Sequence, residues 1–125
     1  MIDTLRPQTI VKELHRVLEI LQVVTATDSR AEAERLAQGS VASRLAASAQ
    51  VDGPLQSVYW WEGKATRAEE WRVTMKTAAD RYQELEAFII ENHSYEMPGI
   101  LATAVASGSE KYLTWVMNET RPPGF

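Results

Sequence analysis

The sequence predicts an α+β domain, in which helices cover one face of an antiparallel sheet. Three observations support this fold class. Segments rich in β-branched or aromatic residues alternate with segments whose apolar residues recur at helical spacing. Two capping boxes, at residues 29–32 and 80–83, mark helix starts. Gly63 separates two strand-like segments and suits the turn of a hairpin.

Composition limits the function classes that the chain can serve. Its 125 residues, 45% of them hydrophobic, suit one folded domain. A net charge of −4 and the lack of a lysine or arginine run argue against a nucleic-acid partner. Cysteine is absent, which excludes disulfides, thiolate metal sites and a cysteine nucleophile. The sequence shows no signal peptide and no run of roughly 18 apolar residues, so we expect a cytoplasmic protein without a membrane partner.

The chain divides into three predicted parts. Residues 1–17 form an N-terminal extension, whose helical apolar spacing fits either a docking helix or a loose leader. Residues 18–120 form the single domain. Residues 121–125, with the sequence RPPGF, form a tail that cannot continue a helix.

Within the domain, each element has its own signal. β-branched residues predict a strand over 19–27, and Ser29 opens a helix that ends at about Leu45. Extended structure resumes at 46–51, and the Asp-Gly-Pro sequence of 52–54 is expected to break it. The remaining predicted elements are strands over 55–62, 69–77 and 100–106 and helices over 80–92 and 107–119. This order is the split βαβ, or ferredoxin-like, arrangement with an extra C-terminal helix.

Bulky aromatic side chains occupy both faces of one predicted strand. Successive strand residues point to opposite faces, so Tyr59 and Trp61 share one face and Trp60 lies on the other. In the ferredoxin-like arrangement the helices cover only one face of the sheet. An uncovered face with large aromatic side chains usually marks an interface. We therefore expect Tyr59, Trp60 and Trp61 to pack against this chain's own helices and against another subunit.

Few residues are candidates for chemistry. His93, one of two histidines, follows a predicted helix and lies close to Glu96, so the pair could hold a transition-metal ion if a second chain adds ligands. The alternative is that His93 only caps the helix and supports an interface. Lys76, in mid-strand, either binds an anionic ligand or is simply solvated. Glu69 and Glu70 point to opposite faces of their strand, which favours solvated hairpin residues over an acid–base pair.

Four segments together resemble the CutA divalent-cation tolerance family, and the similarity extends from about Glu19 to Glu119. The segments are SVYWWEGK (57–64), EEWRVTMKT (69–77), ENHSYEMP (91–98) and SGSEKYLTWV (107–116). The resemblance implies a ferredoxin-like subunit in a tight homotrimer, similar to PII signalling proteins. It also implies a link to copper tolerance and copper binding, with no established enzymatic reaction.

The resemblance suggests where a ligand would bind. Members with bound copper use a histidine of the loop that matches residues 91–98, so His93 is the implied metal ligand, with Glu96 beside it. Trp61, Lys76 and Tyr95 are expected near the same inter-subunit cleft. The implied cofactor is copper or another divalent cation.

Several positions depart from the family pattern. Val24 stands where some members have a cysteine, and Ser48 replaces the cysteine of a common LAAC sequence. Gly99 and Ala104 replace a glutamate and a proline. Loss of a thiol removes the softest copper(I) ligand, and loss of the glutamate removes a charge beside the cleft.

Two functions follow from these observations, and catalysis is not expected. The first is a trimer that takes part in the response to divalent cations and binds a metal ion or small ligand between subunits. The second is a trimeric scaffold, or a PII-like signalling protein, that binds a protein partner or a metabolite without metal.

Overall fold

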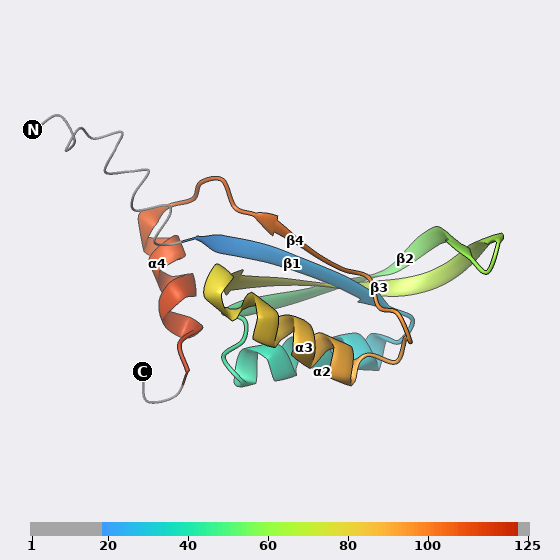
Figure 1. The fold of residues 1–125 in the computed structure, drawn as a ribbon, viewed down its shortest axis with the longest axis horizontal. Coiled ribbons are helices and arrows are strands. Elements are labelled where there is room, and N and C mark those ends of the chain that lie inside the picture. Colours follow the sequence, from blue (N-terminus) through green and yellow to red (C-terminus); the bar gives the residue numbers. More distant parts are fainter. Residues whose placement is uncertain (1–18, 123–125) are drawn as a thin grey trace, which may run out of the picture.

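The computed structural model describes residues 19–122 and confirms the α+β, ferredoxin-like fold (Figure 1). The four strands form one antiparallel sheet in the order β2-β3-β1-β4. The elements are β1 (Ile20–Thr27), α2 (Arg30–Ala42), β2 (Ser48–Trp61), β3 (Lys64–Ala78), the 3₁₀ turn η2 (Ala79–Arg81), α3 (Tyr82–Asn92), β4 (Ile100–Ala104) and α4 (Glu110–Glu119). The predicted helix or leader over 1–17 lies outside the described residues, as do the last residues of the predicted tail.

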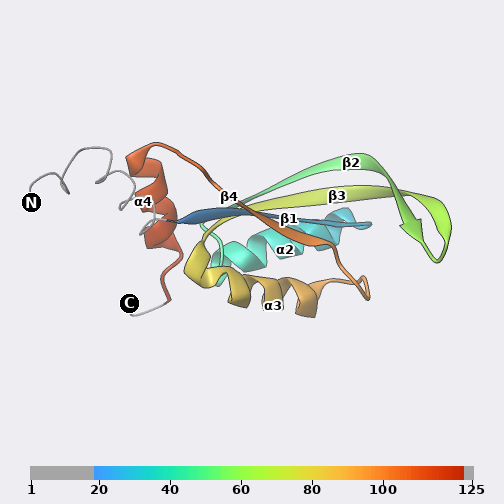
Figure 2. The same ribbon diagram turned by 45° about the horizontal axis from the view of Figure 1, so that its top comes forward.

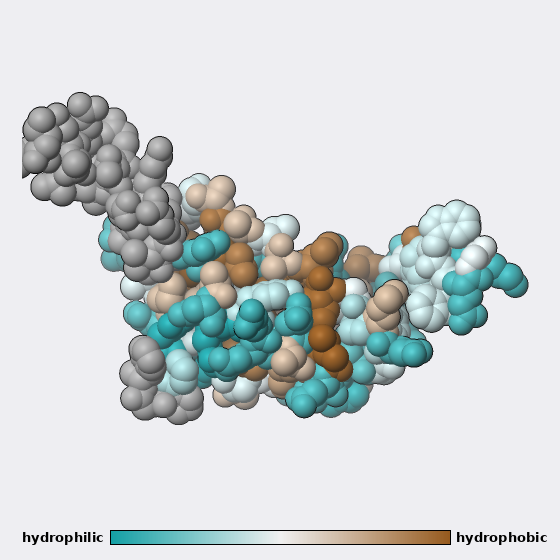
Figure 3. Space-filling view, viewed as in Figure 1, coloured by the Kyte–Doolittle hydropathy of each residue, from teal (hydrophilic) through white to brown (hydrophobic). Residues whose placement is uncertain are grey.

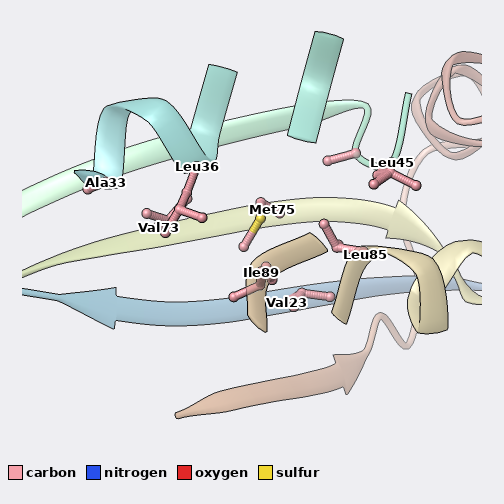
Figure 4. Close-up of a cluster of buried hydrophobic side chains, with 9 residues drawn as sticks. Val23, Ala33, Leu36, Leu45, Val73, Met75, Leu85 and Ile89 are labelled. Carbon is pink, nitrogen blue, oxygen red and sulfur yellow. The ribbon is translucent and has the colours of Figure 1, made fainter. Parts of the chain in front are cut away.

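One face of the sheet carries the core. Helices α2 and α3 lie side by side across it, and their buried Leu36, Leu85 and Ile89 meet Val23 and Met75 of the strands (Figure 4). Helix α4 lies at the end of the sheet and forms a second apolar cluster (Figure 2). The β2–β3 hairpin extends beyond the body that the helices cover (Figure 2). None of the helices within residues 19–122 therefore packs against its outer part.

The predicted break at residues 52–54 is wrong, because β2 continues through them. The Asp-Gly-Pro sequence does not end the strand, because a register shift between Asp52 and Leu55 absorbs it. Gly53 has a φ of +155°, and a Cβ there would lie 2.5 Å from Trp71 Cδ1. The bulge thus depends on a residue without a side chain. Strand β3 also begins earlier than predicted, since Glu62 and Gly63 form a two-residue turn with positive φ angles that suits a hairpin.

The two capping boxes have different outcomes. Ser29 does cap α2, because its Oγ accepts a hydrogen bond from the Glu32 N–H. The Glu32 side chain does not accept a hydrogen bond from the Ser29 N–H, as a full capping box requires, and instead accepts hydrogen bonds from Thr27 and Ser94. The second box is wrong: α3 begins after η2 with no side-chain cap, and Asp80 instead accepts two hydrogen bonds from Arg121. This pairing joins the start of α3 to the end of α4.

The opposite face of the sheet is partly apolar and uncovered by helices. Leu101 of β4 is 73% exposed on this face, and Met97 in the loop before β4 is 71% exposed. Trp60, whose side chain leaves the other face of β2 in the outer part of the hairpin, is 77% exposed. In Figure 3 a band of apolar surface crosses the middle of the molecule, from the region of β4 to that of α3. Within residues 19–122 no helix is long and apolar enough to cross a membrane.

Candidate functional site

A hollow of about 640 Å³ lies between β1, the β2–β3 hairpin and the loop after α3. Volumes of this size are typical of small-molecule pockets. The residues that line it are Val24, Thr25, Ala26, Tyr59, Trp60, Trp61, Glu70, Tyr95, Glu96, Met97, Gly99 and Leu101. Most of them are apolar or aromatic, and the hollow opens on the sheet face that no helix covers.

A hydrogen bond between Tyr95 and Glu70 sits in the wall of the hollow. The Tyr95 hydroxyl donates to Glu70 Oε2 at 2.6 Å. Burial, together with the neighbouring Glu70 carboxylate that accepts this bond, raises the pKa of the Tyr95 hydroxyl far above its usual range. Tyr95 therefore stays protonated at neutral pH and remains a donor to Glu70.

Glu70 corrects another prediction. It was expected to be solvated, but it is only 7% exposed. The alternation along β3 places Val73 and Met75 in the core and Glu70 on the uncovered face. There the loop that carries Tyr95 covers it. Glu69, its neighbour, is exposed as expected.

His93 fastens the loop after α3 to the end of β1. Its Nε2 lies 2.8 Å from the Ala26 carbonyl oxygen, and its Nδ1 accepts a hydrogen bond from the Tyr95 N–H at 3.1 Å. A carbonyl oxygen only accepts, so Nε2 carries the proton and the ring is neutral. The side chain is fully buried. Both ring nitrogens are therefore used within the subunit.

Glu32 holds the same loop from the other side. Its Oε2 accepts hydrogen bonds from Thr27 Oγ1 at 2.5 Å and from the Ser94 N–H and Oγ, both at 3.1 Å. Burial tends to raise the pKa of Glu32, but these hydrogen bonds outweigh it and lower the pKa below its ordinary value. Ser94 lies between His93 and Tyr95, so Glu32 helps to set the position of the Tyr95 wall.

The structure brings together some of the predicted site residues and separates others. Tyr59, Trp60, Trp61, Tyr95 and Glu96 all line the hollow. His93 lies behind its wall and does not line it. Lys76 pairs with Gln22 and Ser48 along the strands. It is six residues from Glu70 on β3, which places it about 20 Å away along the strand.

The residues of one subunit do not fit a copper site. Neither nitrogen of His93 is free to bind a metal, and Glu96 is exposed without a second ligand beside it. No group of three or more histidine, cysteine, aspartate or glutamate residues in the described part of the chain could hold a metal ion. We therefore derive no step that passes through a bound metal.

Comparison with known proteins identifies the family. The model of the CutA1 divalent ion tolerance protein family matches residues 21–119. The chain belongs to this family. It is 31% identical over 110 residues to the chloroplastic protein CutA of Arabidopsis thaliana, and the match covers 88% of this chain and 60% of the relative. It is 34% identical over 85 residues to the divalent-cation tolerance protein CutA of Archaeoglobus fulgidus, covering 68% of this chain and 82% of the relative.

Solved structures of CutA1 proteins have the same fold. The crystal structure of CutA1 from Oryza sativa matches with a TM-score of 0.80 at 31% identity, covering 82% of this chain and 94% of that chain. The chain spans about three fifths of the length of the two plant CutA relatives. The CutA resemblance on which the sequence-based expectations rested is thus confirmed.

Two residues of the site region, Glu70 and Glu32, were not predicted from the sequence. The position of Glu70 could have been predicted from the register of the hairpin. A two-residue turn at Glu62 and Gly63 pairs Tyr59 with Thr66 and Leu55 with Glu70. Paired residues share a face, so Glu70 lies on the same face as Tyr59 and Trp61. Glu32 had no local signal beyond the capping box, since two of the three hydrogen bonds that its carboxylate accepts come from Ser94, 62 residues away.

The hydrogen bond to Glu70 is expected to stabilise the wall of the hollow. Tyr95→Phe removes the only hydrogen bond that the described residues donate to the buried Glu70 carboxylate, so we expect the free energy of unfolding to fall by about 1–3 kcal/mol. Urea unfolding measures this loss. Tyr112→Phe is the matched control, because Tyr112 is 43% exposed and its change should stay within about 0.5 kcal/mol. Equal losses in the two variants would contradict the proposed role of Tyr95.

Proposed function

We propose that this chain forms a homotrimer and acts without catalysis as a binding protein in the response to divalent cations. In this proposal the hollow becomes a cleft between subunits and takes a small ligand. One observation carries it: the hollow lies on the sheet face opposite the described helices α2 and α3, and its outer wall is a hairpin that extends beyond the part of the sheet these helices cover. A second subunit would cover that face.

The exposed apolar side chains support the assembly. Trp60, Leu101 and Met97 are each more than two-thirds exposed, and all three line the hollow. Monomeric proteins rarely leave large apolar patches in contact with water, and such patches mark interaction sites. The predicted interface residues Tyr59, Trp60 and Trp61 belong to the same surface.

A metal site at His93 and Glu96, for copper or another divalent cation, is a second candidate that family membership favours. It would require His93 to release the Ala26 carbonyl or the Tyr95 N–H. A PII-like scaffold that binds a protein partner or a metabolite without metal is supported by two positions. Val24 stands where some members have a cysteine implicated in copper binding, and Gly99 stands where the family usually has a glutamate beside the cleft. A cytoplasmic location stays a prediction.

Copper titration by native mass spectrometry distinguishes these versions of the proposal. We expect a trimer whose copper uptake is unchanged by His93→Ala, because both His93 nitrogens are used inside the subunit. His15→Ala, at the only other histidine, is the control for weak binding by a histidine elsewhere in the chain.

Two results of this titration would count against the favoured version. Three coppers per trimer that are lost in His93→Ala and kept in His15→Ala would establish the metal site instead. A monomer at micromolar concentration would contradict the trimer itself. Because His93 is buried, Glu96→Gln provides a second variant that tests the metal site without removing a loop contact.

A further inference from the structure

The hollow has a negative and aromatic lining. Among the described residues that line it, Glu70 and Glu96 are the only charged ones, and none is a lysine, an arginine or a histidine. Glu70 is 7% exposed, and none of the ion pairs within residues 19–122 includes it. Its Oε2 has a neutral partner, the Tyr95 hydroxyl. A carboxylate this far from water is costly unless a cation compensates its charge.

Aromatic residues line the same hollow as that carboxylate. Tyr59 and Trp61 share the face of Glu70 on the hairpin, and Tyr95 contacts it directly. The faces of tyrosine and tryptophan rings attract cations through their quadrupole. The carboxylate and the aromatic rings of the hollow therefore both favour a positively charged ligand.

The chemistry of the lining distinguishes an organic cation from a metal ion. A divalent metal needs several oxygen or nitrogen ligands at close range, and the described acidic and histidine side chains form no such group. An ammonium group needs one carboxylate to accept its N–H bonds and tolerates apolar and aromatic surroundings for the rest of the molecule. A volume of about 640 Å³ leaves room for an apolar body behind the charged group.

We propose that the hollow binds a small organic ammonium compound, with the charged nitrogen against Glu70 and its apolar body against Tyr95 and directed along the hairpin toward Tyr59 and Trp61. The inference rests on the proposed function, because it names the ligand class of the same cleft. The Glu70 carboxylate is then the specificity-determining group, and Tyr95 positions it.

Isothermal titration calorimetry of the full chain tests the proposal with 2-phenylethylammonium and its neutral analogue 2-phenylethanol. The ammonium compound is expected to bind at least about tenfold more tightly than the alcohol, as a charge-assisted hydrogen bond in a partly dry site implies. Glu70→Gln should remove this preference, and its amide oxygen can still accept the Tyr95 hydrogen bond. Glu69→Gln, one residue away on the opposite and exposed face, should keep the preference.

The outcomes separate this inference from the proposed function. If the wild-type protein binds the two compounds equally tightly, or binds neither, the inference is wrong, and the wild-type measurement alone shows it. A preference that survives in Glu70→Gln would overturn the role of Glu70. The native mass of the same samples reports the trimer independently, so a trimer that does not discriminate the two compounds would refute the ligand class and leave the assembly intact.

Discussion

Leu101→Asp is expected to convert the proposed trimer into monomers. Leu101 is 73% exposed in the subunit, pairs with Val24 on β1 and lines the hollow on the uncovered face. If a neighbouring subunit covers that face, three aspartates per trimer would be buried without partners. An unpaired buried charge costs several kcal/mol, so the dissociation constant should rise by about a thousandfold or more. Sedimentation velocity across a concentration series measures the change.

A matched control separates loss of the interface from a general effect of the charge. Ile90 is also a large exposed apolar residue, at 52%, but it lies on α3, on the side of the sheet that the helices cover. Ile90→Asp should therefore leave the trimer intact. Persistence of the trimer in Leu101→Asp would show that β4 is not part of the interface. Dissociation of both variants would show that the charge acts through folding instead.

Local sequence signals were enough for the fold. The helix that begins at Ser29, the turn at Gly63 and the alternation of Trp71, Val73 and Met75 all depend on residues close together in the chain. These elements leave one face of the sheet without helices, and the aromatic strand already suggested that this face is an interface. The family resemblance added the homologous structures but did not change the order of the elements.

The roles that the sequence did not reveal depend on contacts between residues far apart in the chain. Asp80 reads as a cap for α3 but pairs with Arg121, which lies 41 residues away. His93 has the side chain of a metal ligand, yet the carbonyl of Ala26, 67 residues earlier, takes one of its nitrogens. Which partner a polar side chain finds depends on packing between elements, so a local pattern identifies the residue and not its role.

The continuity of β2 shows a related limit. Gly and Pro normally interrupt a strand, and the sequence pattern alone favoured an interruption at 52–54. The long partner β3 pairs with residues on both sides of the bulge, and Arg72 forms an ion pair with Asp52 at its edge. Pairing with a neighbouring strand therefore outweighs the local preference of Gly53 and Pro54.

Glu32→Ala is expected to lower the free energy of unfolding by about 3 kcal/mol, because it leaves the buried Thr27 hydroxyl and the N–H and hydroxyl of Ser94 without their acceptor. Loss of a negative charge in the first turn of α2 adds to this. Guanidinium unfolding measures the change. Glu34→Ala is the control on the same helix: its carboxylate is exposed and pairs only with Arg30, so about 0.5 kcal/mol is expected. A similar loss in both variants would contradict the role of Glu32 in holding the loop.

The pH dependence of the same contact gives a sharper test. The pKa of Glu32 is lowered in the folded state from an ordinary value of 4.5, so its stabilisation is complete above that pH and is lost as the pH falls through the lower folded value. Glu32→Gln keeps an acceptor oxygen but carries no charge, as protonated glutamate does. The difference in stability between the wild-type protein and Glu32→Gln should therefore be constant near neutral pH and shrink below pH 4.5. A difference that stays constant into acid would mean that shape, and not the ionised carboxylate, holds the loop that forms the wall of the hollow.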